Sequence, residues 1–229
     1  MTSLSYRIIA DETDFLLVDK APGVHFHSQD GSAGLVAQLE RDLNTKLFAV
    51  HRLDTMTSGL ILLARSSAAA AKFTEMFTAH QVQKFYLALA QGKPKKKQGW
   101  VIGDMAKSRR GMYKLLRSTD NPAITQFFSQ SVADGLRLYL LKPLSGKTHQ
   151  LRVALNSVGV PILGDPLYGV ADSGDRGYLH AYALQFDWQG QQFNYVCPPT
   201  QGAQFVSEGV IQQLAEWGEP WQLAWPNKK

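Results

Sequence analysis

The stretch HRLDTMTSGLILLA, residues 51–64, sets a charged segment directly before an apolar one. The uninterrupted apolar residues at 60–64 predict a buried strand, which would hold the preceding loop in a fixed position. In an extended segment, residues i and i+2 point to the same side, so we expect Arg52 and Asp54 to share one environment. A charged pair beside a core strand is costly unless it is paired or used in function. From this stretch alone, a structural ion pair is the favoured interpretation, and a catalytic carboxylate is the alternative.

Short strands and helices alternate along the rest of the chain. Apolar patterns predict strands at 6–10, 15–18, 85–90, 123–128 and 136–141, and helices at 35–43, 66–80 and 203–217. Ser66 is a good N-cap, and Thr148 is predicted to cap a further helix that Gly159 ends. Residues 221–229 are expected to form an irregular strap over the body. With no internal repeat and no flexible linker, the sequence predicts one α+β domain over residues 1–229.

Composition limits the class of protein. A hydrophobic content of 45% with only 19% charged residues argues against disorder, and a net charge of +5 is compatible with a nucleic-acid partner. No apolar run approaches the roughly 18 residues of a membrane span, and the N-terminus lacks the apolar core of a signal peptide. We therefore expect no membrane partner. The single cysteine, Cys197, excludes an internal disulfide and a cysteine-built zinc site, so we expect a protein of the reducing cytoplasm.

Three further segments carry a family resemblance. They read VDKAPGV at 18–24, KFYLAL at 84–89 and SGKTHQLRVALNSVGVPILGDPLYG at 145–169. In this order, and together with HRLD at 51–54, they resemble the RluA-type family of RNA pseudouridine synthases. The resemblance implies a largely antiparallel, bent central sheet flanked by helices and loops, with the active cleft across the sheet. It also implies isomerisation of uridine in tRNA or rRNA to pseudouridine. Because the matching segments begin close to the first residue, we expect a stand-alone, monomeric catalytic domain without the separate amino-terminal RNA-binding domain that many relatives carry.

The resemblance also implies the catalytic residues. Asp54 matches the family's catalytic aspartate, which would act as a nucleophile or as a base that assists glycal formation. Burial alone would neutralise a carboxylate, so a cation is expected beside it, and Arg152 matches the family's partner. Tyr86 matches a tyrosine whose ring packs on the target base. From spacing alone, Arg152 would be a helix-surface arginine and Tyr86 a packing residue. The reaction needs no metal or organic cofactor.

RNA binding is expected from cationic residues. Arg52, by resemblance, enters the RNA and helps to replace the flipped base. Residues 91–120 are basic and turn-rich, and the family carries a mobile RNA-gripping insertion there; the alternative is a solvated surface loop. Lys147 stands where the family usually has arginine, so it keeps the charge but lacks the bidentate fork. The predicted RNA-binding residues are Arg52, Lys84, Lys107, Arg109, Arg110 and Lys147.

Two other functions remain open at this point. The first is a non-catalytic RNA-binding protein on the same scaffold, against which an intact Asp54, Tyr86 and Arg152 argue. The second is a nucleosidase or glycosidase, which typically needs two carboxylates or a metal-bound water. The nearest second acid is Asp165 in GDPLYG, and its surroundings predict a brace for a turn.

Overall fold

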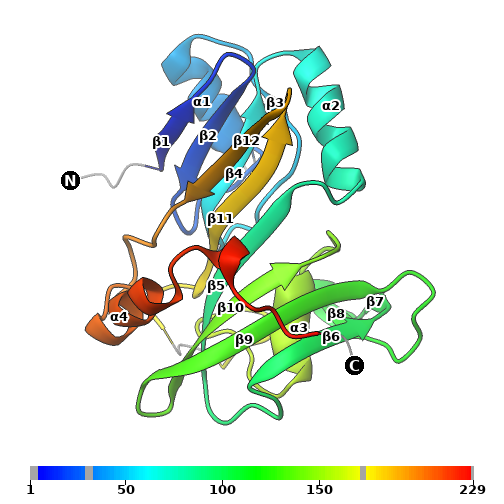
Figure 1. Ribbon diagram of the computed structural model, residues 1–229, viewed down its shortest axis with the longest axis vertical. Coiled ribbons are helices and arrows are strands. Elements are labelled where there is room, and N and C mark those ends of the chain that lie inside the picture. Colours follow the sequence, from blue (N-terminus) through cyan, green and yellow to red (C-terminus); the bar gives the residue numbers. More distant parts are fainter. Residues whose placement is uncertain (1–4, 29–32, 171–173, 228–229) are drawn as a thin grey trace. The chain divides into compact units, whose positions relative to one another are not determined.

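The computed structural model describes residues 5–28, 33–170 and 174–227. The chain forms two compact units (Figure 1). The first unit contains residues 1–82 and 180–199, and the second contains residues 83–179 and 200–229. The prediction of a single domain over 1–229 stays a prediction.

The first unit is a mixed sheet with two helices. Its elements are β1 (Tyr6–Asp11), β2 (Phe15–Lys20), α1 (Leu35–Leu43), β3 (Phe48–Ala49), β4 (Ser58–Ala64), α2 (Ser67–Thr78), β11 (Leu179–Trp188, in this unit from residue 180) and β12 (Gln191–Val196). The strand order is β1-β2-β4-β11-β12, and β3 also pairs with β4. Only the β4–β11 pair is parallel; the others run antiparallel.

Burial explains why these elements form. All seven residues of β4 are buried, which confirms the strand predicted from the apolar run at 60–64. Helix α1 has the predicted bounds, and the Ser66 hydroxyl accepts a hydrogen bond from the Ala69 N–H at the start of α2 (3.1 Å), as expected of an N-cap. The Phe73 ring of α2 stacks on Trp188 of β11, with ring centroids 4.0 Å apart. Strand β4 is therefore a rigid support for the segment that precedes it.

The second unit is an antiparallel sheet with a separate two-stranded hairpin. Its elements are β5 (Gln83–Gln91), β6 (Gln98–Gly103), β7 (Met105–Lys107), a 3₁₀ turn (Arg109–Gly111), β8 (Tyr113–Leu115), β9 (Ala123–Ala133), β10 (Leu136–Pro143), α3 (Gln150–Ser157), α4 (Glu208–Trp217) and a second 3₁₀ turn (Pro220–Gln222). The strand order is β5-β10-β9-β6, and β7 pairs only with β8. The strands predicted at 85–90, 123–128 and 136–141 are confirmed as β5, β9 and β10.

Three predictions about this unit were wrong in part. The region 91–120 is not one long loop, since it contains β6, β7 and β8. Helix α4 begins at Glu208, after a series of turns, and not at 203. Thr148 does not cap α3: the N-cap is His149, and the Gln150 side chain accepts the Lys147 N–H (3.0 Å). A side chain one position inside the helix thus ties down the chain that enters it.

The predicted C-terminal strap is confirmed over the second unit. Trp225 stacks on Phe128 of β9, with ring centroids 4.4 Å apart. The carbonyl oxygen of Pro226 accepts hydrogen bonds from the Trp100 indole (2.8 Å) and the Gln126 amide (2.7 Å). The last two residues, 228 and 229, lie outside the described part of the chain.

These elements confirm an α+β fold with a largely antiparallel sheet. The bend of the sheet and a cleft across its middle stay predictions. Among the residues that the structure describes, no helix combines the length and the apolar character that a membrane span requires.

Candidate functional site

Asp54 lies in the loop that joins β3 to β4 in the first unit. The loop residues 52–54 belong to no strand, so the expected same-face arrangement of a strand does not apply. Asp54 is half-buried and Arg52 is exposed. Among the described residues, none forms an ion pair with Arg52. The interpretation of Arg52 and Asp54 as a structural ion pair is therefore wrong, and the arginine is left exposed to solvent.

His51 fastens the start of this loop to the sheet. Strand β3 pairs with β4 only at Ala64 and Leu63, and the chain then leaves the sheet. The imidazole Nε2 of His51 accepts a hydrogen bond from the backbone N–H of Leu62 (2.8 Å). It takes the place of the carbonyl oxygen that a neighbouring strand would provide. The ring also stacks on Phe77 of α2, with centroids 4.6 Å apart. The residue three positions before Asp54 is thus fixed by a buried strand and a helix.

Lys20 fastens the other end of the loop. Its side chain is fully buried, and its ammonium donates to the carbonyl oxygens of Ala21 (3.0 Å), Val24 (2.9 Å) and Thr55 (3.1 Å). The Gly23 N–H donates to the same Thr55 carbonyl (2.9 Å). Three donors with three acceptors offset the cost of burying an ammonium group. The segment VDKAPG therefore clamps the residue that follows Asp54.

Arg152 lies on α3 in the second unit and is only 4% exposed, so the helix-surface interpretation is wrong. Its Nε and one terminal nitrogen donate to the two carboxylate oxygens of Asp165, at 2.7 and 2.8 Å. The carboxylate also accepts the N–H groups of Leu167 (2.8 Å) and Tyr168 (3.1 Å), which confirms that Asp165 braces its turn. Asp54 belongs to the first unit and Arg152 to the second, and the pairing of these two residues stays a prediction.

Lys84 and Tyr86 are both half-buried residues of β5. Phe85 between them packs against the strap, with its ring centroid 5.7 Å from that of Trp225. Because strand residues alternate, Lys84 and Tyr86 face away from the strap and share the opposite side of the sheet. The Lys84 ammonium lies close to Gly146, in the segment that leads into α3. Burial lowers the pKa of the Lys84 ammonium.

The predicted RNA-binding cations of the region 91–120 gather on the hairpin of β7 and β8. Lys107, Arg109 and Arg110 are all exposed, and none of them forms an ion pair with another described residue. Lys147 differs from them, since its ammonium donates to the Asn121 side-chain oxygen (2.7 Å). The hairpin presents cationic side chains from an ordered backbone, whereas the sequence predicted an irregular loop.

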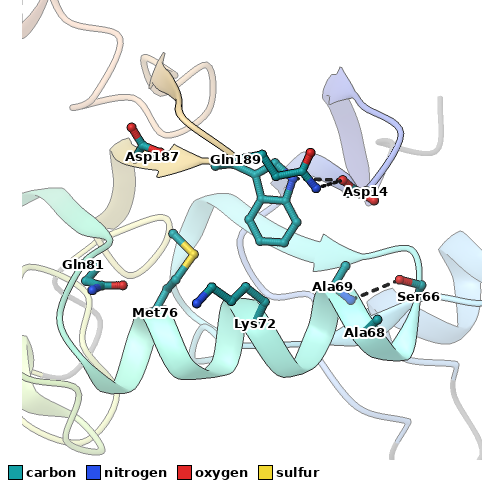
Figure 2. Close-up of a pocket in the computed structure, with 10 residues that line it drawn as sticks. Asp14, Ser66, Ala68, Ala69, Lys72, Met76, Gln81, Asp187 and Gln189 are labelled. Atoms are coloured by element: carbon teal, nitrogen blue, oxygen red, sulfur yellow. Dashed lines mark hydrogen bonds between the residues drawn. The ribbon is translucent and has the colours of Figure 1, made fainter.

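An open groove of about 720 Å³ lies between α2 and the β11–β12 turn in the first unit (Figure 2). Its lining residues are Asp14, Ser66, Ala68, Ala69, Lys72, Met76, Gln81, Asp187, Trp188 and Gln189. The Asp14 carboxylate accepts from the Trp188 indole and the Gln189 amide, both at 3.0 Å. None of the predicted site residues lines this groove, so it has no role in the chemistry expected of Asp54.

One group of described residues has the donor atoms of a metal site but not its arrangement. Ligand atoms of Asp19, His180 and Cys197 lie within 4.8 Å of one another. However, the Arg7 guanidinium lies 3.2 Å from the Asp19 carboxylate and 3.6 Å from the Cys197 sulfur. Both imidazole nitrogens of His180 form 2.7 Å hydrogen bonds, to the Ser58 hydroxyl and the Cys197 carbonyl. Burial also raises the pKa of the Cys197 thiol to about 12. Because the Arg7 cation and these hydrogen bonds already engage the potential ligand atoms, the three residues form a hydrogen-bonded cluster and do not fit a metal ion.

Several residues that hold the candidate residues in place within their own units were not found from the sequence. They are the buried Lys20, the loop anchor His51, the side chain of Gln150, and Tyr168 beside Arg152. Asp165 was recognised as a turn residue, but its ion pair with Arg152 was not. One signal was present: a buried arginine requires a carboxylate, and Asp165 is the next acidic residue along the chain from Arg152.

Comparison with known proteins agrees with these motifs. The family model described as RNA pseudouridylate synthase matches residues 14–157. A Haemophilus influenzae protein described as an uncharacterized RNA pseudouridine synthase is 45% identical over 213 residues, which cover 92% of this chain and 95% of the relative. A Rickettsia bellii protein named ribosomal large subunit pseudouridine synthase C is 40% identical over 124 residues, or 52% of this chain and 41% of that protein.

Solved structures show the same fold. Human RNA pseudouridylate synthase domain containing 1 superimposes with a TM-score of 0.75 at 24% sequence identity, and the match covers 97% of each chain. The family match and the Haemophilus relative together identify the enzyme class, an isomerase that acts on RNA. The chain belongs to the RluA-type family of RNA pseudouridine synthases.

Proposed function

We propose that this protein converts uridine to pseudouridine in ribosomal RNA, with Asp54 as the essential carboxylate. The observation that carries the proposal is the loop of Asp54, which His51 fastens to β4 at one end and Lys20 clamps at the other. A carboxylate held in a fixed loop can act repeatedly on one atom of a bound nucleotide. Ribosomal RNA is preferred over transfer RNA because the Rickettsia relative is named for the large ribosomal subunit.

The reaction exchanges one glycosidic bond for another. The bond between uracil N1 and ribose C1′ breaks, the base rotates, and C5 bonds to C1′. The C5 hydrogen leaves as a proton, and N1, which keeps the electron pair of the broken bond, takes one up. Asp54 acts either as a nucleophile or as the base that removes a ribose proton to give a glycal. Tyr86 packs on the target base, and its hydroxyl takes part in the late proton transfer. Arg152 keeps Asp54 ionised.

Access to the uridine requires that it leave its helix. Extrusion of a base costs a few kcal/mol, which contacts to the vacated position must offset. Arg52 is exposed and two residues from Asp54, which suits entry into the RNA stack. The hairpin cations Lys107, Arg109 and Arg110 contact phosphates, since exposed side chains without protein partners lose little on binding them. The single, buried Cys197 supports action in the reducing cytoplasm.

The test replaces Asp54 with asparagine and follows the release of tritium from RNA labelled at uridine C5. Asp54→Asn should abolish release while RNA affinity stays within about tenfold, because the amide is isosteric but is neither nucleophile nor base. The control is Asp134→Asn, which removes an exposed carboxylate in the β9–β10 turn and should leave the rate unchanged. Release by Asp54→Asn at the wild-type rate would contradict the assignment of Asp54.

Two further outcomes separate the alternatives. A wild-type protein that binds RNA and releases no tritium from any substrate would support the non-catalytic RNA-binding function. Ribosomal and transfer RNA, each isolated from cells that lack the gene, serve as parallel substrates. Tritium release from transfer RNA alone would overturn the preference for ribosomal RNA without touching the role of Asp54.

A further inference from the structure

We propose that Tyr168 couples the β7–β8 hairpin to Arg152, so that RNA held on the hairpin fixes the position of this arginine. The inference rests on the proposed function, in which the hairpin binds RNA and Arg152 serves the catalytic carboxylate. Tyr168 is a positioning residue, since it acts through Arg152 and not on the substrate.

The hydroxyl of Tyr168 holds the hairpin. It accepts a hydrogen bond from the backbone N–H of Tyr113, the first residue of β8, at 2.7 Å. Tyr113 pairs with Lys107 of β7, so this bond lies in the rung of the hairpin nearest its cationic turn. Each strand of this hairpin has three residues, which is too short for an isolated hairpin to be stable. The hydrogen bond from the Tyr113 N–H to Tyr168 therefore helps to stabilise the hairpin.

The same hydroxyl contacts the start of α3. It lies 3.1 Å from Nδ1 of His149, the N-cap residue of that helix. His149 has a φ of 57°, a left-handed conformation that costs energy for a residue with a Cβ and so requires support from its surroundings. The His149 ring stands edge-on to Tyr113 (centroids 5.5 Å apart) and to Tyr168 (5.8 Å). The three rings therefore join β8, the first turn of α3 and the turn after Asp165.

The ring and backbone of Tyr168 contact the arginine and its counter-ion. The Arg152 guanidinium carbon lies 5.1 Å from the centre of the Tyr168 ring, within the range of a cation–π contact. The Tyr168 N–H donates to the Asp165 carboxylate that also binds Arg152. Tyr168 is only 7% exposed, so its ring has no freedom to move without its neighbours. A displacement of the hairpin is thus transmitted through one rigid side chain to the buried ion pair.

Tyr168→Phe tests the coupling, because it removes the hydroxyl and keeps the ring over Arg152. The matched control is Tyr178→Phe in the same unit, which also loses a buried hydroxyl bonded to a backbone N–H, that of Gln204 (3.0 Å). At saturating enzyme, the single-turnover rate of Tyr168→Phe should fall about tenfold, because both hydrogen bonds of the hydroxyl, to Tyr113 and to His149, are lost. The slope of affinity against salt should fall by about one, since the hairpin cations are held less well. Tyr178→Phe should change neither quantity.

A double-mutant cycle measures the coupling itself. In the wild-type background, the double substitution Arg109→Ala, Arg110→Ala should lower the single-turnover rate. In the Tyr168→Phe background, where the link is already broken, the factor by which it lowers this rate should be at least about threefold smaller. Additive losses, or equal effects of Tyr168→Phe and Tyr178→Phe, would overturn the proposal. The hydrogen-exchange rate of the Tyr113 amide should rise in Tyr168→Phe, and this reading needs no activity. An unchanged exchange rate would also overturn it.

A second variant guards against a folding defect in the first. His149→Asn removes a ring contact to Tyr168 while asparagine tolerates the left-handed backbone. It should shift the rate and the Tyr113 exchange in the same direction as Tyr168→Phe, and no shift would count against the coupling. Absence of tritium release by the wild type would refute the proposed function alone, because the exchange of the Tyr113 amide would still report the link.

Discussion

Arg110 and Arg152 belong to the same unit and have opposite surroundings. Arg110 lies at the turn of the hairpin, exposed, with a φ of 54° and no ion pair to a described residue. Arg152 is buried and binds both oxygens of Asp165 through two hydrogen bonds. Water already solvates the first guanidinium, whereas only protein groups can offset the lost hydration of the second.

This difference separates two tasks that the chemistry requires. Contact with RNA phosphates needs a cation that reaches outward and tolerates several geometries. Stabilisation of a charge at one atom needs a cation that is held in one position when the reaction occurs. The exposed hairpin suits the first task and the Arg152–Asp165 pair suits the second. The two regions should therefore respond differently to mutation, in stability for the buried pair and in RNA affinity for the hairpin.

The largest effect is expected from Asp165→Asn. It removes the charge of the carboxylate that binds the buried Arg152 guanidinium through two hydrogen bonds, so the free energy of unfolding should fall by about 3 to 5 kcal/mol in urea titrations. The control is Glu75→Gln, which breaks the Lys72–Glu75 pair, whose side chains are 57% and 68% exposed and 3.0 Å apart. That change should cost less than about 0.5 kcal/mol. Similar losses in the two variants would remove the distinction between the buried and the exposed cations.

The next effect concerns the hairpin. The triple variant Lys107→Ala, Arg109→Ala, Arg110→Ala should lower RNA affinity and reduce its salt slope by up to about three, one unit for each lost phosphate contact. Its free energy of unfolding should stay within about 0.5 kcal/mol of wild type, because exposed side chains without partners contribute little. The control Arg41→Ala, Lys46→Ala, Lys72→Ala removes three exposed charges from the first unit. Equal slopes for the two triple variants would show that only net charge matters.

The sequence predicted the parts of this molecule that repeat a local pattern. Helix α1 has the predicted bounds because apolar residues recur with the helical period, and α2 begins where Ser66 can accept a backbone N–H. Strands β7 and β8 were missed because three residues are too few to show a period. Their order comes partly from Tyr168, more than fifty positions further along the chain, which no local pattern reveals.

The candidate site residues show the same contrast between local patterns and tertiary contacts. The types of residue expected to act, such as Asp54 and Arg152, could be found from motifs of adjacent residues. The residues that hold them could not, since Asp165 and Lys20 make their bonds to other segments only after folding. The Gln150 side chain replaced the predicted Thr148 cap for a similar reason, because it also bonds the Ser145 hydroxyl and the Ile124 carbonyl. Tertiary contacts decide such positions, and propensity alone does not.

A smaller effect is expected at His51, which holds the loop of Asp54 without any charge of its own. His51→Phe keeps a ring against Phe77 and removes the acceptor for the Leu62 N–H, so the single-turnover rate should fall about tenfold. RNA affinity should change by less than about twofold, because His51 packs against β4 and α2 and is not among the residues proposed to contact phosphates. His51→Gln retains an acceptor of similar reach and should recover most of the rate. Equal rates for the two variants would show that the hydrogen bond does not position the loop.

The smallest effect is expected from Cys197, a buried group that stays neutral. Burial, with a further contribution from the Asp19 carboxylate, raises its pKa from 9.0 to about 12. The Cys197 thiol therefore keeps its proton in the folded protein at pH values above 9, where the thiol of the unfolded chain loses it. The resulting stabilisation is complete below that pH and declines as the pH rises toward 12. Relative to Cys197→Ala, the wild type should lose about 1 kcal/mol in free energy of unfolding between pH 8 and 10.

The comparison with Cys197→Ala is needed because Tyr195, whose pKa burial also raises to about 12, titrates in both proteins and so cancels. The same urea titrations, repeated between pH 7 and 10.5, give the difference directly. A constant difference across this range would mean that the thiol titrates alike in the folded and unfolded chains. The Arg7 guanidinium, 3.6 Å from the sulfur, would then stabilise the thiolate enough to offset the effect of burial on the pKa of Cys197.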